Sequence, residues 1–336
     1  MSAGNTGVLI SVVLAVGYIT LAILVWSMVS AVYRKIRGRS RLNITGRWVV
    51  ITGCDSGIGL GLVTALSERG AKVVACCYTE AGAHGALAAG AAWAPHFDLT
   101  KDDAIREVAA QIHARSDGAV WSVVHAAGTV LPGFVDYQPI NFYRDVMAVN
   151  FFAPVLLTQK LLSALRRCKG RVVLVSSVDG IVSLPGNAPY DASKFAIEAY
   201  ADALRAELSF CDVFVSVINP ATMRTPMAEG FFPAHRNTWQ AMAKDDPGGD
   251  WQALWPESWL EQYVEKNTQQ LRSIAEDPAA AVSDVVHAVT AAHPKLRYLS
   301  GRLAKTFFYA LWLMPEAWSL RIKRLTVQPQ PPRNSS

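Results

Sequence analysis

Three side chains in one stretch have the types and spacing of a proton-transfer site. Tyr190 and Lys194 are four residues apart, so a helix would place them on one face, one turn from each other. A lysine ammonium beside a phenol stabilises the phenolate and lowers the tyrosine pKa from about 10 towards neutrality. Such a tyrosine is a general acid/base, and a serine hydroxyl at a strand end, that of Ser177, can hold the same substrate oxygen. Because surface helices also carry Tyr and Lys at this spacing by chance, the surrounding elements must decide.

Apolar, β-branched runs alternate with helix-like stretches along the chain. Continuous apolar strands that alternate with helices are typical of a parallel sheet covered on both faces, which binds ligands beyond the carboxyl ends of its strands. The sequence therefore predicts an α/β fold with a single doubly wound parallel-sheet (Rossmann) domain. The expected strands are 48–52, 72–77, 94–97, 120–125, 171–176 and 213–219, with 296–300 as a seventh candidate, and the main expected helices are 104–113, 143–167 and 190–210.

A glycine-rich turn follows the first expected strand. Thr52 leads into Gly53, Gly57 and Gly59 in the pattern TGxxxGxG, and a helix-like stretch runs on to Arg69. Glycines permit a tight turn and a close backbone approach, and the amino terminus of the helix then faces a pyrophosphate. The glycines alone are weak evidence. Together with the serine, tyrosine and lysine on the fifth strand and its helix, they predict a dinucleotide site.

The joint pattern resembles the classical short-chain dehydrogenase/reductase family over roughly residues 46–300. The stretches TGCDSGIG, SKFAIEAYADALRAEL and VVHAVTAAHPKLRY are most similar to the branch with membrane-bound retinol dehydrogenases, 17-beta-hydroxysteroid dehydrogenases and D-3-hydroxybutyrate dehydrogenase. The resemblance implies hydride transfer between a nicotinamide cofactor and an alcohol or ketone. A non-catalytic cofactor- or lipid-binding protein on the same fold is the alternative, but such a protein would not need the whole catalytic set.

The resemblance also implies a role for each matching residue. Tyr190 would be the acid/base, Lys194 would lower its pKa and hold the nicotinamide ribose, and Ser177, rather than Ser176, would position the substrate oxygen. Asn150 would hold a proton-relay water. The implied catalytic set is Ser177, Tyr190, Lys194 and Asn150. The implied cofactor-binding set is Thr52, Gly53, Asp55, Ser56, Gly57, Ile58, Gly59, Cys77, Asp98, Leu99, Ala126, Ala127, Gly128, Tyr190, Lys194, Pro220, Thr222 and Thr225.

Two positions depart from the family pattern. The sequence at 125–128 is His-Ala-Ala-Gly, where the family usually has Asn-Asn-Ala-Gly. The small residues still let the backbone approach the cofactor. His125 is either a second proton carrier or, as we expect, a hydrogen-bonded histidine at a strand end. Ala221 follows Pro220 where the family commonly has glycine, which restricts the backbone slightly.

The residues near the end of the second expected strand favour NAD(H) as the cofactor. Cys77 stands where NAD enzymes of the family often carry Asp, and NADP enzymes place Arg or Lys there or at the position of Ser56. Neither position therefore has a positively charged side chain that could bind a 2′-phosphate. Asp55 can accept a hydrogen bond from a ribose hydroxyl and would repel a phosphate. Asp98 matches the residue that bonds the adenine amine, with a helix cap as the alternative.

The amino-terminal stretch predicts a membrane anchor. Residues 1–33 carry no charged side chain, and 8–33 are almost wholly apolar, long enough for a helix to cross a hydrocarbon layer of roughly 30 Å. We prefer an uncleaved, single-pass anchor to a signal peptide or a core helix. The basic linker 34–45 then places the following domain in the cytosol, on the endoplasmic reticulum or alternatively a mitochondrial membrane.

The carboxyl-terminal third suggests how a substrate enters. Residues 221–270 follow the sixth strand and should form a substrate lid. Their four tryptophans suit a bulky apolar alcohol or ketone, such as a steroid or retinoid, with ordinary helix packing as the alternative. Residues 301–336 contain the apolar run 306–314, which has aromatic and basic neighbours and suits a helix lying in the membrane interface. Core packing or a homodimer contact is the alternative, and the final ten residues have the composition of a disordered tail.

Composition excludes some other classes of partner. The net charge of +5 comes from basic residues that precede the first acidic residue, Asp55, so the domain itself has no nucleic-acid-binding balance. The five cysteines have no CxxC or metal-ligand spacing, which predicts reduced core residues and no metal site. A short hydroxy acid remains the alternative substrate, because the resembling branch includes a membrane-bound enzyme for one.

Overall fold

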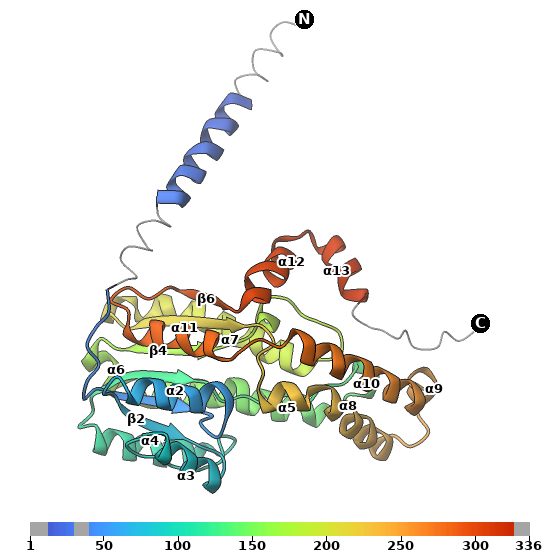
Figure 1. The fold of residues 1–336 in the computed structure, drawn as a ribbon, viewed down its shortest axis with the longest axis horizontal. Helices are drawn as coiled ribbons and strands as arrows, with labels where there is room; N and C mark the ends of the chain where they lie inside the picture. The colour runs from blue at the N-terminus through green and yellow to red at the C-terminus, as the bar shows by residue number, and fades with distance from the viewer. Residues whose placement is uncertain (1–12, 30–39, 326–336) are drawn as a thin grey trace, which may run out of the picture. The chain divides into compact units, whose positions relative to one another are not determined.

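The computed structural model of the chain describes residues 13–29 and 40–325 (Figure 1). The chain divides into two units. The first contains the residues up to Asn43 together with Thr290–Lys295, and the second contains Ile44–Val289 and the chain from Leu296 onwards. The expected functional residues from Thr52 to Thr225 all lie in the second unit.

One sheet of six parallel strands forms the centre of the second unit (Figure 1). The strand order is β2-β1-β3-β4-β5-β6, so β1 lies beside the edge strand β2 and the later strands follow in chain order on its other side. This order brings the carboxyl ends of neighbouring strands to one edge, where open parallel sheets bind ligands. The strands are β1 (Trp48–Thr52), β2 (Lys72–Cys76), β3 (Val120–His125), β4 (Arg171–Val175), β5 (Phe214–Pro220) and β6 (Arg297–Ser300).

Helices cover both faces of the sheet, which confirms the predicted doubly wound fold. They are α2 (Gly57–Ser67), α3 (Glu80–Ala88), α4 (Asp102–Arg115), α5 (Ile140–Met147), α6 (Ala153–Cys168), α7 (Ala188–Leu208) and α11 (Ala279–Thr290). Successive side chains of a strand point to opposite faces. Val49 and Ile51 accordingly pack with α2 and α11, whereas Val50 packs in a second core cluster with α4, α6 and α7.

The expected strand 94–97 is not a strand of this sheet. The segment runs beside β2 and makes isolated parallel bridges, Val74 with Trp93 and Cys77 with His96. Pro95 accepts a hydrogen bond from the Cys77 N–H but has no N–H of its own to donate. A regular ladder therefore cannot continue through this segment. The weaker candidate 296–300 is the sixth strand, because Arg297–Ser300 pairs in parallel with β5.

Residues 221–270, the predicted lid, contain three helices, α8 (Pro226–Asp245), α9 (Trp251–Leu254) and α10 (Glu257–Ile274). Trp251, Trp255 and Trp259 are buried in one aromatic cluster with Phe134 and Tyr137, which follow β3. Within this cluster Phe134 stacks on Trp255 with 4.5 Å between the ring centroids. Helix packing, the alternative interpretation, therefore accounts for these three tryptophans.

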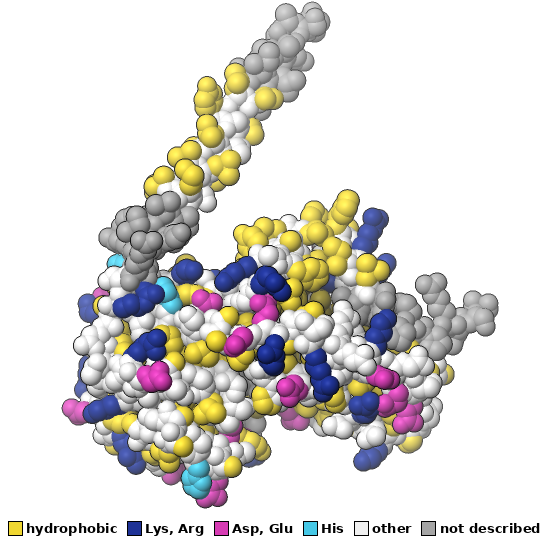
Figure 2. All heavy atoms as spheres, viewed as in Figure 1, with side chains coloured by type: hydrophobic (Ala, Val, Ile, Leu, Met, Phe, Trp, Pro, Cys, Tyr) yellow, Lys and Arg dark blue, Asp and Glu magenta, His cyan; other side chains and the backbone are white. Residues whose placement is uncertain are grey.

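The described chain ends in three short helical segments, η5 (Ala304–Phe308), α12 (Tyr309–Leu313) and α13 (Glu316–Arg324). Phe308 and Leu311 are buried against Ile181 and Val182, in the loop after β4. Other apolar side chains of these segments are exposed and gather on one face (Figure 2). We call them the C-terminal apolar surface: Phe307, Tyr309, Trp312, Leu313, Trp318 and Leu320. The expected disordered tail lies outside the described residues.

The first unit contains the apolar helix Val13–Val29, whose side chains are all exposed. Its length of about 25 Å is short of a bilayer core, and the remaining parts of the predicted span, like most of the basic linker, lie outside the described residues. Within the described residues, one helix is long and apolar enough to cross a membrane, the continuous run Ile140–Cys168. Leu157 and Leu161 of that run are buried in the sheet core, so it is a core helix of the domain.

Candidate active site

The structure brings Ser177, Tyr190 and Lys194 together, as the sequence predicts. Ser177 follows β4 and caps the short 3-10 helix η3 (Val178–Gly180), and Tyr190 and Lys194 lie in the first turns of α7. The Lys194 ammonium is 5.3 Å from the centroid of the Tyr190 ring and donates a 2.9 Å hydrogen bond to the carbonyl oxygen of Val175. One turn of helix and one strand end therefore fix the relative positions of all three side chains.

The choice between the two neighbouring serines follows from their surroundings. The Ser177 hydroxyl contacts Asp179, and its hydrogen bond opposes the rise in the Tyr190 pKa, so the hydroxyl faces the tyrosine. Ser176 Oγ is buried without a hydrogen-bond partner, and a Cβ at Gly180 would lie 2.5 Å from it. Ser176 Oγ therefore lies in the packed side of the loop, whereas the Ser177 hydroxyl faces the predicted acid/base.

The ionisation of the site differs from the simple expectation. Burial raises the pKa of Tyr190 well above its usual range, and the nearby Asp179 carboxylate raises it further. Burial also lowers the pKa of Lys194 to about 8, against the opposing effect of the Asp179 and Glu198 carboxylates. In this structure the Tyr190 pKa is thus displaced in the direction opposite to the expected one. The phenol is protonated at neutral pH, and in this form it can donate a proton.

Asn150 lies in a π-helical turn, η2 (Ala148–Phe152), between α5 and α6. Its side-chain amide donates to the Thr129 carbonyl at 3.0 Å and to Ser193 Oγ at 2.9 Å, and it accepts from the Thr129 N–H at 2.8 Å. Such π-helical turns often occur at functional sites. These bonds tie the loop after β3 to α7 beside Lys194.

The glycine turn forms a close-packed cradle. Gly53 has a φ of +74°, and a Cβ there would lie 2.5 Å from the Ala127 Cα. A Cβ at Gly59 would lie 2.0 Å from the Gly53 carbonyl oxygen. Thr52 Oγ1 accepts a 3.2 Å hydrogen bond from the Ala127 N–H, which fixes the loop after β3 against the turn. A backbone surface this close to a helix amino terminus fits a nucleotide pyrophosphate.

The other end of the cradle is closed by the loop after β5. A Cβ at Gly57, which has a φ of +56°, would lie 3.2 Å from Thr225 Cγ2, so Thr225 contacts the turn directly. Thr225 also caps α8 by accepting a bond from the Ala228 N–H. A Cβ at Gly128 would lie 3.7 Å from Lys194 Nζ, which connects the cradle with the catalytic group. Residues predicted from five separate stretches thus surround one site.

The acidic group at the end of β2 comes from the glycine turn. Asp55 accepts hydrogen bonds from the Tyr78 N–H and the Thr79 N–H, both at 2.9 Å, and from Thr79 Oγ1 at 2.8 Å. Cys77 is buried in the core, and burial raises the pKa of its thiol to about 12. This chain lacks the family's carboxylate at position 77, and the Asp55 carboxylate lies against the two residues that follow Cys77.

The structure distinguishes the two alternatives for His125 and shows the hydrogen bonds of Asp98, whose role towards a cofactor stays a prediction. His125 is buried, its Nε2 lies 2.8 Å from Thr158 Oγ1, and burial lowers its pKa to about 3. This confirms the hydrogen-bonded strand-end histidine rather than a proton carrier. Asp98 accepts bonds from the Thr100 N–H and hydroxyl, both at 2.8 Å, and so stabilises the turn before α4. All five cysteines are free.

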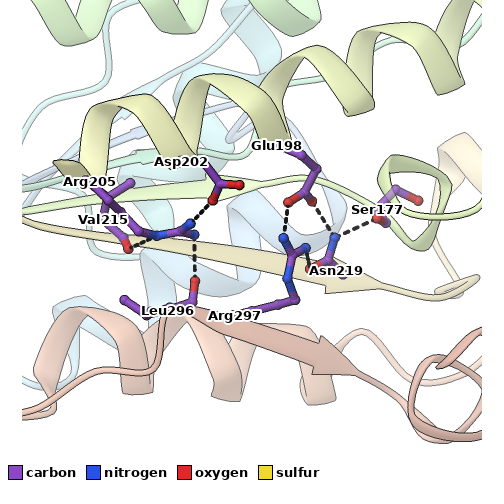
Figure 3. Close-up of polar contacts among 8 residues, drawn as sticks. All are labelled: Ser177, Glu198, Asp202, Arg205, Val215, Asn219, Leu296 and Arg297. Atoms are coloured by element: carbon purple, nitrogen blue, oxygen red, sulfur yellow. Dashed lines mark hydrogen bonds and ion pairs between the residues drawn. The ribbon is translucent and has the colours of Figure 1, made fainter. Parts of the chain in front are cut away.

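A polar network that was not predicted from the sequence lies behind Ser177 (Figure 3). Asn219, at the end of β5, donates to the Ser177 carbonyl oxygen at 2.8 Å and to Glu198 Oε1 at 2.6 Å. Arg297 of β6 donates to Asn219 Oδ1 at 2.9 Å and forms a 2.7 Å ion pair with Glu198. A strand-end asparagine and a glutamate one turn after Lys194 were the available sequence signals. Only the neighbouring position of β6 identifies their partner.

Comparisons with known proteins agree with this geometry. The family model for short chain dehydrogenases matches residues 47–236. The chain belongs to the short-chain dehydrogenase/reductase family. Within it, the chain lies in the branch of retinol and 17-beta-hydroxysteroid dehydrogenases.

Curated relatives match over most of their length. The chain is 31% identical to retinol dehydrogenase 7 of Mus musculus over 279 residues, which cover 81% of this chain and 86% of the relative. It is also 31% identical, with the same coverage, to 17-beta-hydroxysteroid dehydrogenase type 6 of Bos taurus. These similarities make the chain an oxidoreductase of a family that acts on alcohols and ketones with a nicotinamide cofactor.

Solved structures support the fold of this short-chain dehydrogenase/reductase. A short-chain dehydrogenase from Streptomyces avermitilis matches with a TM-score of 0.65 and 24% identity, covering 84% of this chain and 96% of that one. One from Burkholderia cenocepacia, solved in complex with NADP, matches with a TM-score of 0.62 and 21% identity, covering 84% and 99%.

Proposed function

We propose that this protein is a membrane-anchored, NAD(H)-dependent oxidoreductase that interconverts a lipophilic secondary or allylic alcohol and its carbonyl compound. The convergence of Ser177, Tyr190 and Lys194 beside the glycine cradle carries the proposal. A bound nicotinamide would supply the hydride acceptor or donor. In reduction, Tyr190 would donate its phenolic proton to the substrate oxygen, Ser177 would hold that oxygen, and Lys194, which lies near Gly128, would hold the cofactor ribose.

NAD(H) is favoured by the charges near the end of β2. Asp55 lies there and is held by two backbone amides and one hydroxyl, so its carboxylate is fixed in place. A 2′-phosphate near this carboxylate would meet a like charge, whereas a ribose hydroxyl can donate to it. Tyr78 and Thr79, which follow Cys77, carry no positive charge.

The proposed membrane attachment has two parts. The first is the amino-terminal apolar span, of which helix Val13–Val29 is the described part. The second is the C-terminal apolar surface, where Trp312 and Trp318 are exposed and basic residues follow, including Arg321 and Arg324. Aromatic and basic side chains on an apolar helix suit the bilayer interface.

The buried part of the same C-terminal segment connects membrane and catalysis in this proposal. Phe308 and Leu311 pack against Ile181 and Val182, which lie four and five residues after Ser177. A substrate dissolved in the bilayer would then need to cross little water to reach the loop after β4. This favours a steroid- or retinoid-like substrate over a short hydroxy acid.

The proposed chemistry is tested by Tyr190→Phe. Proton transfer by a placed side chain contributes about 10²–10⁴-fold in rate, so kcat should fall at least that far while cofactor affinity stays within a few-fold. Tyr200→Phe is the matched control, because Tyr200 is on the same helix, is half-buried, and packs against Phe151 and not against Ser177 or Lys194 in the contacts that the structure describes. Turnover of retinoids, steroids and short hydroxy acids would be compared. Near-normal turnover by the Tyr190 variant would refute the assigned mechanism.

A further inference from the structure

The carboxylate of Asp179 lies beside Ser177 and has no role in the proposed hydride and proton transfer. Ser177 Oγ and Asp179 Oδ2 are 3.1 Å apart, and the Asp179 N–H donates to the same Oγ, also at 3.1 Å. Both contacts belong to the turn that Ser177 caps, so the local backbone fixes them. Asp179 therefore controls two of the three hydrogen-bonding positions of the serine hydroxyl.

A serine hydroxyl has one proton to donate and two lone pairs with which to accept. An ionised carboxylate can only accept, so ionised Asp179 draws the Ser177 proton towards itself. A protonated Asp179 can instead donate to Ser177 Oγ. Both lone pairs of Ser177 are then occupied, one by the Asp179 N–H and one by the Asp179 carboxyl. The serine proton is then available for a substrate oxygen, as a developing alkoxide requires.

We propose that Asp179 is a positioning residue that gates Ser177: its ionised form holds the serine proton, and its protonated form releases that proton to a carbonyl oxygen of the substrate. The proposal rests on the proposed function, and it deepens that function by favouring ketone reduction at the acidic end of the working range. It requires no new covalent step, because only the direction of one hydrogen bond changes.

The charges that face Asp179 come mainly from α7. Burial raises the pKa of Asp179, whereas the hydrogen bond from Ser177 and the Lys194 ammonium favour the ionised carboxylate and oppose this rise. Asp191 is buried, and burial together with the nearby Asp179 carboxylate raises its pKa. Lys323 of α13 acts on Asp191 in the opposite sense. Tyr190 is neutral over this range.

The test compares kcat/KM for ketone reduction by the wild type, Asp179→Asn and Asp179→Leu from about pH 5 to pH 9. The wild type should lose activity as pH rises through the Asp179 ionisation, below the pKa of Tyr190. Both variants should lack this loss, because an amide can donate to Ser177 at every pH and a leucine accepts nothing. At the alkaline end they should exceed the wild type about 10-fold or more. Asp145→Asn, an exposed carboxylate on α5, should keep the wild-type profile.

A second measurement does not depend on turnover. Ultraviolet titration of tyrosinate, with Tyr190→Phe as the baseline, should show a lower Tyr190 pKa in Asp179→Asn because a nearby negative charge is gone. Thermal unfolding checks that each variant is folded. If the wild type and both Asp179 variants are active and have the same pH profile, or if the Tyr190 titration is unchanged in Asp179→Asn, the gating by Asp179 is refuted but the proposed function is not. A wild type without carbonyl reductase activity would overturn the proposed function and the gating with it.

Discussion

Replacing Arg297 should cost both stability and turnover, through the network behind Ser177. Arg297→Met keeps much of the side-chain volume but removes the ion pair with Glu198 and the bond to Asn219 (Figure 3). Glu198 would then be left as a carboxylate with no cationic partner in this network, in a position where it is 8% exposed. Asn219 would lose one of the contacts that orient its amide towards the Ser177 carbonyl.

The size of the effect follows from the burial of the pair. Removing one partner of a buried ion pair costs about 3–5 kcal/mol. The side chains of Arg297 and Glu198 are 24% and 10% exposed, so solvent relieves part of this cost and about 3 kcal/mol is expected. In a domain of this size that corresponds to a fall in Tm of roughly 6–12 °C. A displacement of Ser177 of the order of 1 Å would lower kcat by about 10–100-fold.

Arg205→Met is the matched control for this prediction. Arg205 bridges the same three elements, with contacts to Asp202 on α7, the Val215 carbonyl on β5 and the Leu296 carbonyl before β6 (Figure 3). Asp202 is 67% exposed and can be solvated, so the control should lose only about 1–2 kcal/mol.

None of the Arg205 contacts reaches a catalytic residue, so kcat at a temperature well below Tm should stay near the wild-type value. Thermal unfolding and steady-state kinetics measure both quantities. Equal losses of kcat in the two arginine variants would refute the positioning argument, and an unchanged Tm for Arg297→Met would refute the estimate of the ion pair.

Three further predictions concern the cofactor and the membrane. Gly59→Ala should weaken cofactor binding and lower the free energy of unfolding by about 1–3 kcal/mol, because the new Cβ would lie 2.0 Å from a carbonyl oxygen of the turn. Gly85→Ala is the control, because its Cβ would meet open space, and it should leave stability unchanged or raise it. Calorimetry and cofactor titration measure the two effects. The ratio of kcat/KM for the two cofactors should favour NAD(H), and a preference for NADPH would contradict the argument from like charges. A chain that starts at residue 40 should still sediment with lipid vesicles, and Trp312→Glu with Leu313→Glu should release it, whereas Phe210→Glu, an exposed apolar residue elsewhere, should not. A truncated chain that stays in solution would count against the second attachment. The buried Leu311 is unsuitable for this test, because a charge there would disrupt the core.

The local patterns that predicted the site were those with a fixed geometry. The spacing of four between Tyr190 and Lys194 determines a shared helix face wherever that helix lies. The glycines of the turn likewise determine a backbone shape. A φ of +74° at Gly53 is unfavourable for other residues, and a Cβ at Gly59 would lie only 2.0 Å from a carbonyl oxygen. Apolar runs of five residues predicted five of the six strands, because a parallel sheet buries both faces of a strand.

The questions that the sequence left open or answered wrongly depended on neighbours distant in sequence. The segment at Pro95 has strand-like composition, but a ladder also needs a donor at each alternate position. The tryptophans of the lid have the composition of a substrate pocket, and only their position against Phe134 shows that they pack together. The expected effect of Lys194 on Tyr190 considered one neighbour, whereas burial and Asp179 together determine the sign of the pKa shift.

The sequence by itself therefore determined the family, the order of the elements and the residues that meet at the strand ends, because these follow from local geometry repeated along the chain. The tertiary structure decided the electrostatics and the support of the site. Burial, the contact of Asp179 with Ser177 and the placement of Arg297 behind Asn219 arise only when β4, β5, β6 and α7 pack together. The free energy of a charge depends on everything within a few ångströms of it, and in a folded chain those neighbours come from distant parts of the sequence.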